Sequence, residues 1–481
     1  MQSEKISHII ILILLIFVLP AACVQTEQGK NNYLPPAKKP ELKIKSCRDC
    51  HPFRLDRNHN FSCHQCHAGQ NGSSAKEAHK GMIAAPASPA MMGKRCGPCH
   101  AGEVAALRSS LHFTLRRAVN LTRRAFGASR DLASLTHVPP AARPATPLQL
   151  ADDMLRRRCL RCHLFYSGDP YPATLHGLGC AACHLSYRND KLTSHAFLKS
   201  PGDYQCQSCH YGNVAGADYY GRFEHNYNWD YRTPFSTSDN YQPPYGIRYH
   251  QLTPDIHQQR GMVCLDCHPG NQLMGRAKGP SCKACHLYQK GSLMPANITI
   301  KNGLPWLTEK KDGRKHQIPQ AVNPAHKIKK TACQVCHAQW SFNDRGISLL
   351  RQDNDNFNAW LALTRQGDFE VEQQLDANLF QDNGQGGAVM TDKLNGSEQQ
   401  GIWLKTYLSR RWEPVNICRD SHGVLQVCRT VLDLSLSYVN KDGEVILDAV
   451  KPAASYSAPR PYTPHTTGRA GIFFRQRLKV N

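Results

Sequence analysis

Long apolar runs are nearly missing from this sequence. Only residues 9–19 form one, and no other stretch approaches the roughly 18 apolar residues that a membrane-spanning helix needs. Apolar side chains spaced for one face of a helix are also scarce. After this run we therefore expect no transmembrane helix and no ordinary hydrophobic core.

The apolar run belongs to what we interpret as an export signal, residues 1–22. Cys23 follows it and resembles the lipidated cysteine of a bacterial lipoprotein signal, although Pro20 takes the place of the usual leucine. Lipidation of Cys23 is the prediction, and an ordinary cleaved signal with an incidental cysteine is the alternative. The polar residues 23–45 are interpreted as an extended tether.

Cysteine is concentrated in one repeated pattern. Eighteen of the 21 cysteines lie in nine Cys-x-x-Cys-His motifs, numbered here along the chain. Their cysteines, from motif 1 to motif 9, are Cys47 and Cys50, Cys63 and Cys66, Cys96 and Cys99, Cys159 and Cys162, Cys180 and Cys183, Cys206 and Cys209, Cys264 and Cys267, Cys282 and Cys285, and Cys333 and Cys336. The histidines that end them are His51, His67, His100, His163, His184, His210, His268, His286 and His337.

This pattern is the attachment signature of c-type haem. The two thiols add to the haem vinyl groups, and the adjacent imidazole is aimed at the iron as the proximal ligand. Zinc knuckles and thioredoxin-like pairs also use Cys-x-x-Cys, but they do not need a histidine after every second cysteine, and all nine pairs have one. We therefore expect nine covalently bound c-type haems as cofactors.

Histidine is also plentiful outside the motifs, where it can supply the sixth ligand of a closed haem iron. His59 and His176 each stand four residues before a motif, and His257 and His326 each stand seven before one. Candidate distal ligands are His59, His79, His112, His176, His195, His257, His326 and His465. Several of the remaining histidines, which are His137, His225, His250, His316 and His422, are interpreted as ordinary. Which iron each candidate serves stays open.

The motifs fall into three groups of three. This spacing indicates trihaem modules over residues 46–138, 148–253 and 254–340, with the proline-rich stretch 139–147 as a linker. Residues 341–481 carry no motif and are expected to form a haem-free C-terminal region.

The expected fold class is mostly α and irregular, a haem-packed multihaem arrangement with short helices, long loops and little sheet. With one haem for about 32 residues, the porphyrins themselves would be the core. Helices are predicted over residues 103–126, 148–160 and 357–379, the last broken near Gly367. In the C-terminal region, alternation over 424–438 and a turn before 444–450 predict a β-hairpin.

Cys418 and Cys428 have no following histidine and cannot form a tenth motif. In an oxidising compartment we expect a local disulfide between them, and a reactive thiol pair is the alternative.

Residues 211–253 form a long connector crowded with tyrosine. Loops of this length are usually functional or disordered, and aromatic richness argues against disorder. The rings either pack against haem faces or line a substrate channel or docking surface.

Basic residues outnumber acidic ones, and the formal net charge is +22. An anionic partner is the simple inference, but nine haems would bring up to about 18 propionate charges. Much of the lysine and arginine is therefore expected to neutralise the cofactors, and no nucleic-acid partner is expected. Attraction to anionic redox partners or oxyanions stays open.

Residues 47–337 resemble the multihaem c-type cytochromes of metal-respiring bacteria. The segment with His257, Cys264 and His268 is similar to an element of those proteins, and Pro-His-Thr at His465 resembles the segment that precedes a haem motif there. No motif follows His465 here. More distantly, the many motifs, the lipoprotein-like start and the haem-free C-terminus resemble lipoprotein cytochromes associated with selenite and tellurite reduction.

This resemblance implies an exported electron-transfer protein of anaerobic or extracellular respiration. Closely packed haems with two histidine ligands each would carry electrons between redox proteins, a periplasmic or membrane donor and an acceptor cytochrome. A lipid on Cys23 would hold the protein to a membrane, on the periplasmic side or at the outer membrane, and a porin-cytochrome complex is one assembly it could join.

A reductase of an oxyanion such as selenite or tellurite, or of a nitrogen compound, is the alternative. It needs one iron with an open sixth position and nearby arginine, lysine, tyrosine or histidine. Every motif ends in histidine, which favours electron transfer, and no catalytic residue is assigned from the sequence.

Overall fold

The computed structural model describes residues 46–72, 74–171, 173–188, 191–212, 216–224, 249–310, 312–328, 330–358, 366–367, 369–379, 387–412, 415–470 and 474–479. They belong to a single unit, residues 45–481. The export signal, Cys23, the tether and most of the tyrosine-rich connector, with His225, lie outside the described residues.

Most motifs fold as one short helical turn, which brings the histidine beside its own cysteines. The backbone N–H of His51 donates to the carbonyl of Cys47 at 2.9 Å, and motifs 3, 5, 6 and 7 repeat this bond. Helices that contain or adjoin motifs are α1 (Cys47–Cys50), α2 (Cys63–His67), α5 (Gly97–Ser109), α9 (Ala181–His184), α10 (Asp203–Gln207), α12 (Cys264–Cys267), α14 (Cys282–His286) and α15 (Cys333–His337). The others are α3 (Ala75–Ala78), α4 (Met92–Arg95), α6 (Leu111–Thr114), α7 (Arg116–Ala125), α8 (Pro147–Met154), α11 (Ile256–Gln259), α13 (Gly270–Leu273), α17 (Phe369–Leu379), α18 (Ala454–Ser457) and α19 (Phe474–Arg477).

Strands are far more numerous than the sequence indicated. The described residues are 31% helical and 20% strand, with seven small sheets, so the expectation of a mostly α and irregular fold is wrong and the chain is mixed α/β. Six of the seven sheets have only two or three strands: β1 (Ser186–Arg188) with β2 (Lys191–Ser194), β3 (Arg222–Glu224) with β4 (Tyr249–Gln251), β5 (Ile298–Lys301) with β6 (Leu304–Thr308) and β7 (Lys315–Gln317), β8 (Asn343–Arg345) with β14 (Ser409–Arg411), β11 (Val389–Thr391) with β12 (Glu398–Gln400), and β15 (Ile417–Arg419) with β16 (Leu425–Arg429) and β19 (Arg460–Pro461).

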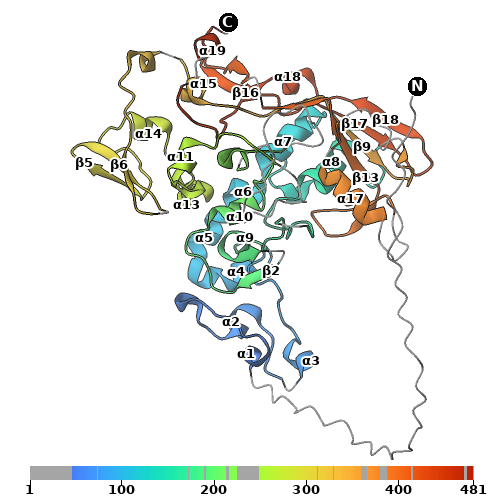
Figure 1. Cartoon of the computed structure of the whole chain (residues 1–481). Helices are drawn as coiled ribbons and strands as arrows, with labels where there is room; N and C mark the ends of the chain where they lie inside the picture. The colour runs from blue at the N-terminus through green and yellow to red at the C-terminus, as the bar shows by residue number, and fades with distance from the viewer. Residues whose placement is uncertain are drawn as a thin grey trace, which may run out of the picture. The chain divides into compact units, whose positions relative to one another are not determined.

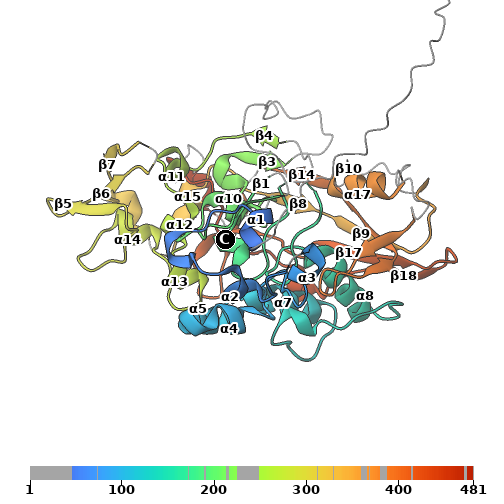
Figure 2. The same ribbon diagram turned by 90° about the horizontal axis from the view of Figure 1, so that it is seen from below.

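The seventh sheet has five strands and organises the C-terminal region. Its order is β10 (Gln366–Gly367), β13 (Ile402–Tyr407), β9 (Ile347–Gln352), β17 (Leu434–Val439) and β18 (Val445–Val450). The β17–β18 pair is the hairpin read from the sequence, but β17 also pairs in parallel with β9, nearly 90 positions earlier in the chain. Figures 1 and 2 show these orange and red strands beside α8 and α17.

Both faces of this sheet bury apolar side chains, because successive residues of a strand point to opposite sides. Trp403 and Leu349 join a core with residues of α7 and α8 on one face. Leu404 and Leu350 join a second core with α17 on the other face. The C-terminal region therefore has the ordinary hydrophobic core that the sequence analysis did not expect, and residues of the first two groups of motifs contribute to it.

Two of the predicted helices are interrupted. Residues 103–126 fold as three helices, α5, α6 and α7, because Ser110 is extended and Leu115 adopts a left-handed conformation with φ of 42°. Residues 148–160 begin as α8 and continue as a π-helix, Leu155–Cys159. Of the predicted helix 357–379, α17 is present and residues 359–365 lie outside the described residues. None of the described helices has the length and apolar character that crossing a bilayer requires.

Candidate haem-binding sites

Seven of the nine motif histidines face a second histidine. The ring centroids of each pair lie 6.0–6.3 Å apart. The pairs are His51–His79, His67–His195, His100–His59, His210–His112, His268–His465, His286–His257 and His337–His326. Each second histidine is one of the eight candidate distal ligands, and only His176 among those candidates is not in such a pair.

This spacing fits an iron atom between two imidazoles. Two metal–nitrogen bonds of about 2.0 Å, with roughly 1.1 Å from each nitrogen to its ring centre, place the centroids about 6.2 Å apart. Two stacked or hydrogen-bonded rings would lie closer together. The residues present therefore fit a haem at these seven positions, where the iron would supply one-electron chemistry when bound.

Hydrogen bonds to the Nδ1 atoms hold many of these rings in one orientation. Nδ1 of His67 donates to the carbonyl of Ile83 at 2.9 Å, and Nδ1 of His337 donates to the carbonyl of Gly468 at 2.9 Å. On the distal side, Nδ1 of His257 contacts Asp255 at 2.8 Å. Such bonds fix the tautomer that leaves Nε2 for a metal and increase the basicity of the ligand.

Burial keeps several motif histidines neutral, the form that binds iron. Desolvation is the main cause that lowers the pKa of His163 and of His210 to about 4. Desolvation also lowers the pKa of His268 and of His286.

Contacts between thiols of different motifs show which motifs are neighbours. The thiols of five cysteine pairs lie close enough to interact directly: Cys47–Cys63, Cys96–Cys180, Cys206–Cys264, Cys282–Cys333 and Cys162–Cys209. Three more pairs interact electrostatically, Cys66–Cys96, Cys183–Cys206 and Cys267–Cys285. These contacts join motifs 1, 2, 3, 5, 6, 7, 8 and 9 in one line, and motif 4 branches from motif 6.

The line passes through the three groups of motifs in sequence order, except that motif 4 lies beside it and not in it. Motif 3 of the first group contacts motif 5, and motif 4 contacts motif 6 through Cys162 and Cys209. Distal candidates also cross between groups, since His195 faces His67 and His112 faces His210.

Motif 4 differs from the others in its backbone and in its histidine. Cys159 ends the π-helix, and residues 160–163 continue as turn and bend without a helical turn over the motif. Nε2 of His163 donates to the carbonyl of Lys393 at 3.0 Å, while its Nδ1 accepts from the backbone N–H of Phe165 at 3.0 Å. Both ring nitrogens are therefore engaged by the protein.

His176 lies near motif 4 and has the opposite arrangement. Nδ1 of His176 donates to the carbonyl of Gly177 at 2.9 Å, and its buried Nε2 has no hydrogen-bond partner among the described residues. The ring interacts electrostatically with Cys162 and His163 but does not reach the spacing of the seven pairs. A buried nitrogen without a partner is costly in a folded protein, so this atom is available to a bound group.

Motif 5 also lacks a paired ring within the described part of the chain. Nδ1 of His184 donates to the carbonyl of Leu198 at 2.7 Å, as in the paired motifs. Its thiols keep it inside the line between motifs 3 and 6.

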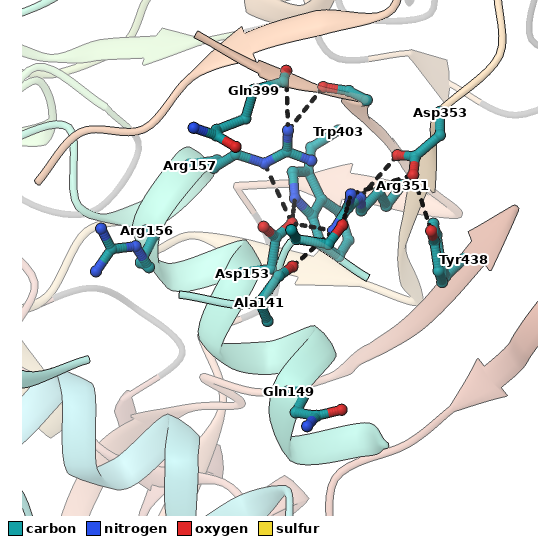
Figure 3. Close-up of polar contacts among 12 residues, drawn as sticks. Ala141, Gln149, Asp153, Arg156, Arg157, Arg351, Asp353, Gln399, Trp403 and Tyr438 are labelled. Atoms are coloured by element: carbon teal, nitrogen blue, oxygen red, sulfur yellow. Dashed lines mark hydrogen bonds and ion pairs between the residues drawn. The ribbon is translucent and has the colours of Figure 1, made fainter. Parts of the chain in front are cut away.

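Three consecutive buried arginines hold motif 4 against the C-terminal region. Arg156 bonds Asp392 at 2.7 Å, and Arg158 bonds Glu370 at 2.6 Å. Arg157 contacts Asp153 at 3.2 Å and donates to the carbonyls of residues 399, 400 and 401 at 3.3, 2.7 and 2.9 Å. Figure 3 shows Arg157 and Arg351 on either side of Asp153, beneath strand residues. This arginine triplet directly precedes Cys159.

The same network fixes the linker between the first two groups. Arg351 donates to the carbonyls of Ala141 and Ala142 at 3.1 and 2.6 Å. Thr146 caps α8 by accepting from the backbone N–H of Gln149 at 3.3 Å. The linker is therefore a fixed part of the C-terminal interface and not a free tether.

A buried lysine from the C-terminal region lies beside motif 4. Lys393 is 4% exposed, forms an ion pair with Asp169 and lies 3.4 Å from the hydroxyl of Tyr166, which in turn donates to Asp169 at 2.7 Å. The ring of Tyr166 lies 6.2 Å from that of His163. Arg161, inside the motif, pairs with Glu370. Sequence analysis missed this cluster, because Lys393 and Glu370 stand in a region without motifs; the Arg-Arg-Arg run before Cys159 was the available signal.

Two further features of the sequence are the cysteine pair of the C-terminal region and the tyrosine-rich connector. Cys418 and Cys428 form a disulfide, and their Cα atoms are 5.8 Å apart. Of the tyrosine-rich connector, Tyr219 donates to the carbonyl of Met262 at 2.8 Å and Tyr249 to that of Tyr211 at 3.3 Å. These tyrosines support packing between segments; the rest of the connector lies outside the described residues.

Comparison with protein-family models, with curated proteins and with solved structures finds no match to this chain. Within the described ranges, no cluster of three or more His, Cys, Asp or Glu side chains is arranged to hold a metal ion by itself. A haem iron needs only axial ligands from the protein, because the porphyrin supplies the others. The function must therefore be argued from the motifs and the histidine pairs.

Proposed function

We propose that this protein is an exported nonahaem c-type cytochrome that transfers electrons through closely packed haems. The single observation that carries the proposal is the set of seven histidine pairs at a centroid spacing of 6.0–6.3 Å, each with one member from a Cys-x-x-Cys-His motif. Iron with two imidazole ligands has no open position, which suits electron transfer and not substrate chemistry.

The thiol contacts support a continuous path. Covalent attachment places each haem beside its own cysteines, so motifs whose thiols touch carry neighbouring haems. Motifs 1 and 9 are the ends of the line, and motif 4 is the end of a branch from motif 6. Redox proteins would exchange electrons with the haems of motifs 1 and 9, at the two ends of the line.

The anchor and the location remain part of the proposal. Lipidation at Cys23 would hold the protein to a membrane, at the periplasmic side or the outer membrane. Excess positive charge would partly serve the haem propionates.

Haem content and spin state test the proposal directly. Mass spectrometry of the purified exported protein should show nine added haem groups. Electron paramagnetic resonance of the oxidised protein should show mostly low-spin iron. A protein without covalent haem, or one whose haems are mostly high-spin, would contradict it.

A further inference from the structure

We propose that Asp56 and Asp255 are positioning residues, each of which organises the axial ligands of three successive haems. The chain therefore contains two equivalent three-haem units, formed by motifs 2, 3 and 5 and by motifs 7, 8 and 9. This inference rests on the proposed function and deepens it, because it assigns the residues that hold and tune the ligands of particular haems.

One carboxylate oxygen of each aspartate holds the distal histidine of the middle haem in its unit. Nδ1 of His257, which faces motif 8, donates to Oδ1 of Asp255 at 2.8 Å, and the side chain of Asp255 is 4% exposed. Nδ1 of His59, which faces motif 3, lies 2.9 Å from both carboxylate oxygens of Asp56. Because an ionised carboxylate only accepts hydrogen bonds, each ring carries its proton on Nδ1 and leaves Nε2 for the iron.

The other carboxylate oxygen holds a four-residue segment from a distant part of the chain. Oδ2 of Asp255 accepts from the backbone N–H of Thr467 at 2.6 Å. Oδ2 of Asp56 accepts from the backbone N–H of Phe197 at 3.0 Å. Each donor is the third residue of its segment, and the two segments are residues 465–468 and 195–198.

The first residue of each segment is the distal histidine of the first haem in the unit. His465 faces His268 of motif 7, and His195 faces His67 of motif 2, both at the ring spacing that one iron requires. One carboxylate therefore connects the distal ligands of two haems. It bonds one ligand at the ring and holds the other through the backbone two residues further on.

The fourth residue of each segment holds the proximal histidine of the third haem. The carbonyl of Gly468 accepts from Nδ1 of His337 in motif 9 at 2.9 Å, and its N–H donates to the carbonyl of the same histidine at 2.9 Å. Leu198 makes the same two bonds with His184 in motif 5, at 2.7 and 2.8 Å. This pair of bonds fixes both the place of the histidine and the rotation of its ring.

The motifs of each unit are neighbours in the line of thiol contacts. Motifs 2, 3 and 5 follow one another there, and so do motifs 7, 8 and 9. In both units the haem with the carboxylate is the middle one. The segments His-Ala-Phe-Leu and His-Thr-Thr-Gly share only their histidine, so the repeated arrangement lies in the contacts and not in the sequence.

The carboxylate also changes the electronic properties of the middle haem. Its negative charge makes the imidazole more basic, which favours the oxidised iron and lowers the reduction potential. In the flanking motifs 2 and 9, Nδ1 of His67 and of His337 donate to uncharged carbonyls. Asp218 lies 3.7 Å from Nδ1 of His465, which is too far for a hydrogen bond. Each unit therefore has a middle step whose potential is lowered by a bonded carboxylate.

Asp255→Asn in the nine-haem protein tests the electronic role. A neutral acceptor replaces a charged one, so the one-electron equilibrium of one haem should shift about tenfold toward the reduced form. This shift is a midpoint potential about 59 mV higher, seen in about one ninth of the haem absorbance during a redox titration. Asp56→Asn should shift one haem in the same direction but by less, because Asp56 is 21% exposed and solvent screens its charge.

Carbon monoxide binding to the reduced protein tests the connection between haems. An amide has a single oxygen, so the side chain in Asp255→Asn cannot accept from both His257 and Thr467. The segment 465–468 should loosen, and CO should displace His465 at a concentration about 10- to 100-fold lower. His465→Ala alone should admit about one additional CO, and the double variant with Asp255→Asn should admit no more than that.

Asp266→Asn is the matched control. The side chain of Asp266 is also 4% exposed and lies inside motif 7, but it bonds the N–H of Val263 and the ammonium of Lys310 instead of an axial histidine. This substitution should leave CO binding unchanged. The same comparison with Asp56→Asn and His195→Ala tests the other unit.

The outcomes separate this inference from the proposed function. Two additional CO molecules in the double variant, or equal effects of Asp255→Asn and Asp266→Asn, would overturn the shared role of Asp255. Unchanged potentials and unchanged CO binding in nine-haem variants of both aspartates would overturn the units but leave electron transfer intact. Absence of covalent haem would contradict the proposed function itself.

Discussion

Replacing Arg157 by methionine should loosen the C-terminal sheet by several kcal/mol. The side chain of Arg157 is 1% exposed, and its guanidinium bonds Asp153 and three backbone carbonyls of the segment that leads into β13. Methionine fills much of the same volume but leaves these acceptors without their donor. Removing one partner of a buried ion pair typically costs about 3–5 kcal/mol.

Part of this loss is offset at Asp153. Its carboxylate keeps Arg351 at 3.3 Å and the indole N–H of Trp403 at 2.9 Å. The carbonyl of Gln400 also accepts from Arg351 at 3.4 Å, so the loss falls mainly on the carbonyls of Gln399 and Gly401, and a buried acceptor without a partner costs about 1–3 kcal/mol. We therefore expect about 3–5 kcal/mol in total, concentrated where β13 meets α8.

Amide hydrogen exchange of β13 measures this local effect, since sub-global opening governs exchange in such strands. A loss of 3–5 kcal/mol should speed exchange of the Ile402–Tyr407 amides roughly 10²- to 10³·⁵-fold. Arg124→Met is the control, because Arg124 pairs with Asp131 at the surface, where both side chains are about half exposed and such pairs contribute about 0–1 kcal/mol. Similar, small changes in both variants would refute the idea that Arg157 holds the interface.

Other outcomes follow from the histidine pairs, the tyrosines and the disulfide. His326→Ala should open the iron position opposite His337 and add about one CO per protein to the total, whereas His422→Ala, at an exposed histidine, should leave it unchanged. Burial, and then the hydrogen bond to Asp353, raise the pKa of Tyr438 to about 12. Protonated Tyr438 therefore stabilises the fold fully below its usual pKa of about 10, and this contribution is lost as the pH rises through 12. The free energy of unfolding, measured by denaturation between these pH values, should consequently fall less in Tyr438→Phe than in the unmodified protein. Replacing Cys418 and Cys428 together by alanine should cost about 2–3 kcal/mol and speed proteolysis between β15 and β16 without loss of haem; an unchanged cleavage rate would mean that the strands hold the loop alone.

The motifs and most candidate ligand positions were accessible from sequence because haem attachment uses a local pattern. A thiol pair and its histidine lie within five residues, and an offset such as four residues before Cys63 is visible by inspection. Which distal histidine faces which motif histidine could not be predicted from the sequence. His59 faces His100, 41 positions later, and His465 faces His268 from the C-terminal tail. Neither partner follows from spacing.

The C-terminal fold was underestimated for a physical reason. The 402–407 strand, Ile-Trp-Leu-Lys-Thr-Tyr, is a short apolar run that is buried on both faces, so it shows no alternation. Its neighbour β9 ends in Arg351 and Gln352, which look like surface residues but are buried, Arg351 in an ion-pair network and Gln352 in a hydrogen bond to Asn354. The parallel β9–β17 pairing depends on contacts far apart in the chain, which no local pattern encodes.

The arginine triplet also bears on the order in which the protein is matured and folded. Arg156 and Arg158 cannot form their ion pairs until Asp392 and Glu370 are present, and these residues follow them by 236 and 212 positions. A chain that crosses a membrane from its N-terminus exposes motif 4 long before those carboxylates arrive. Under the proposed function, maturation enzymes would attach the motif 4 haem during this interval, and the last residues exported would close the protein over it.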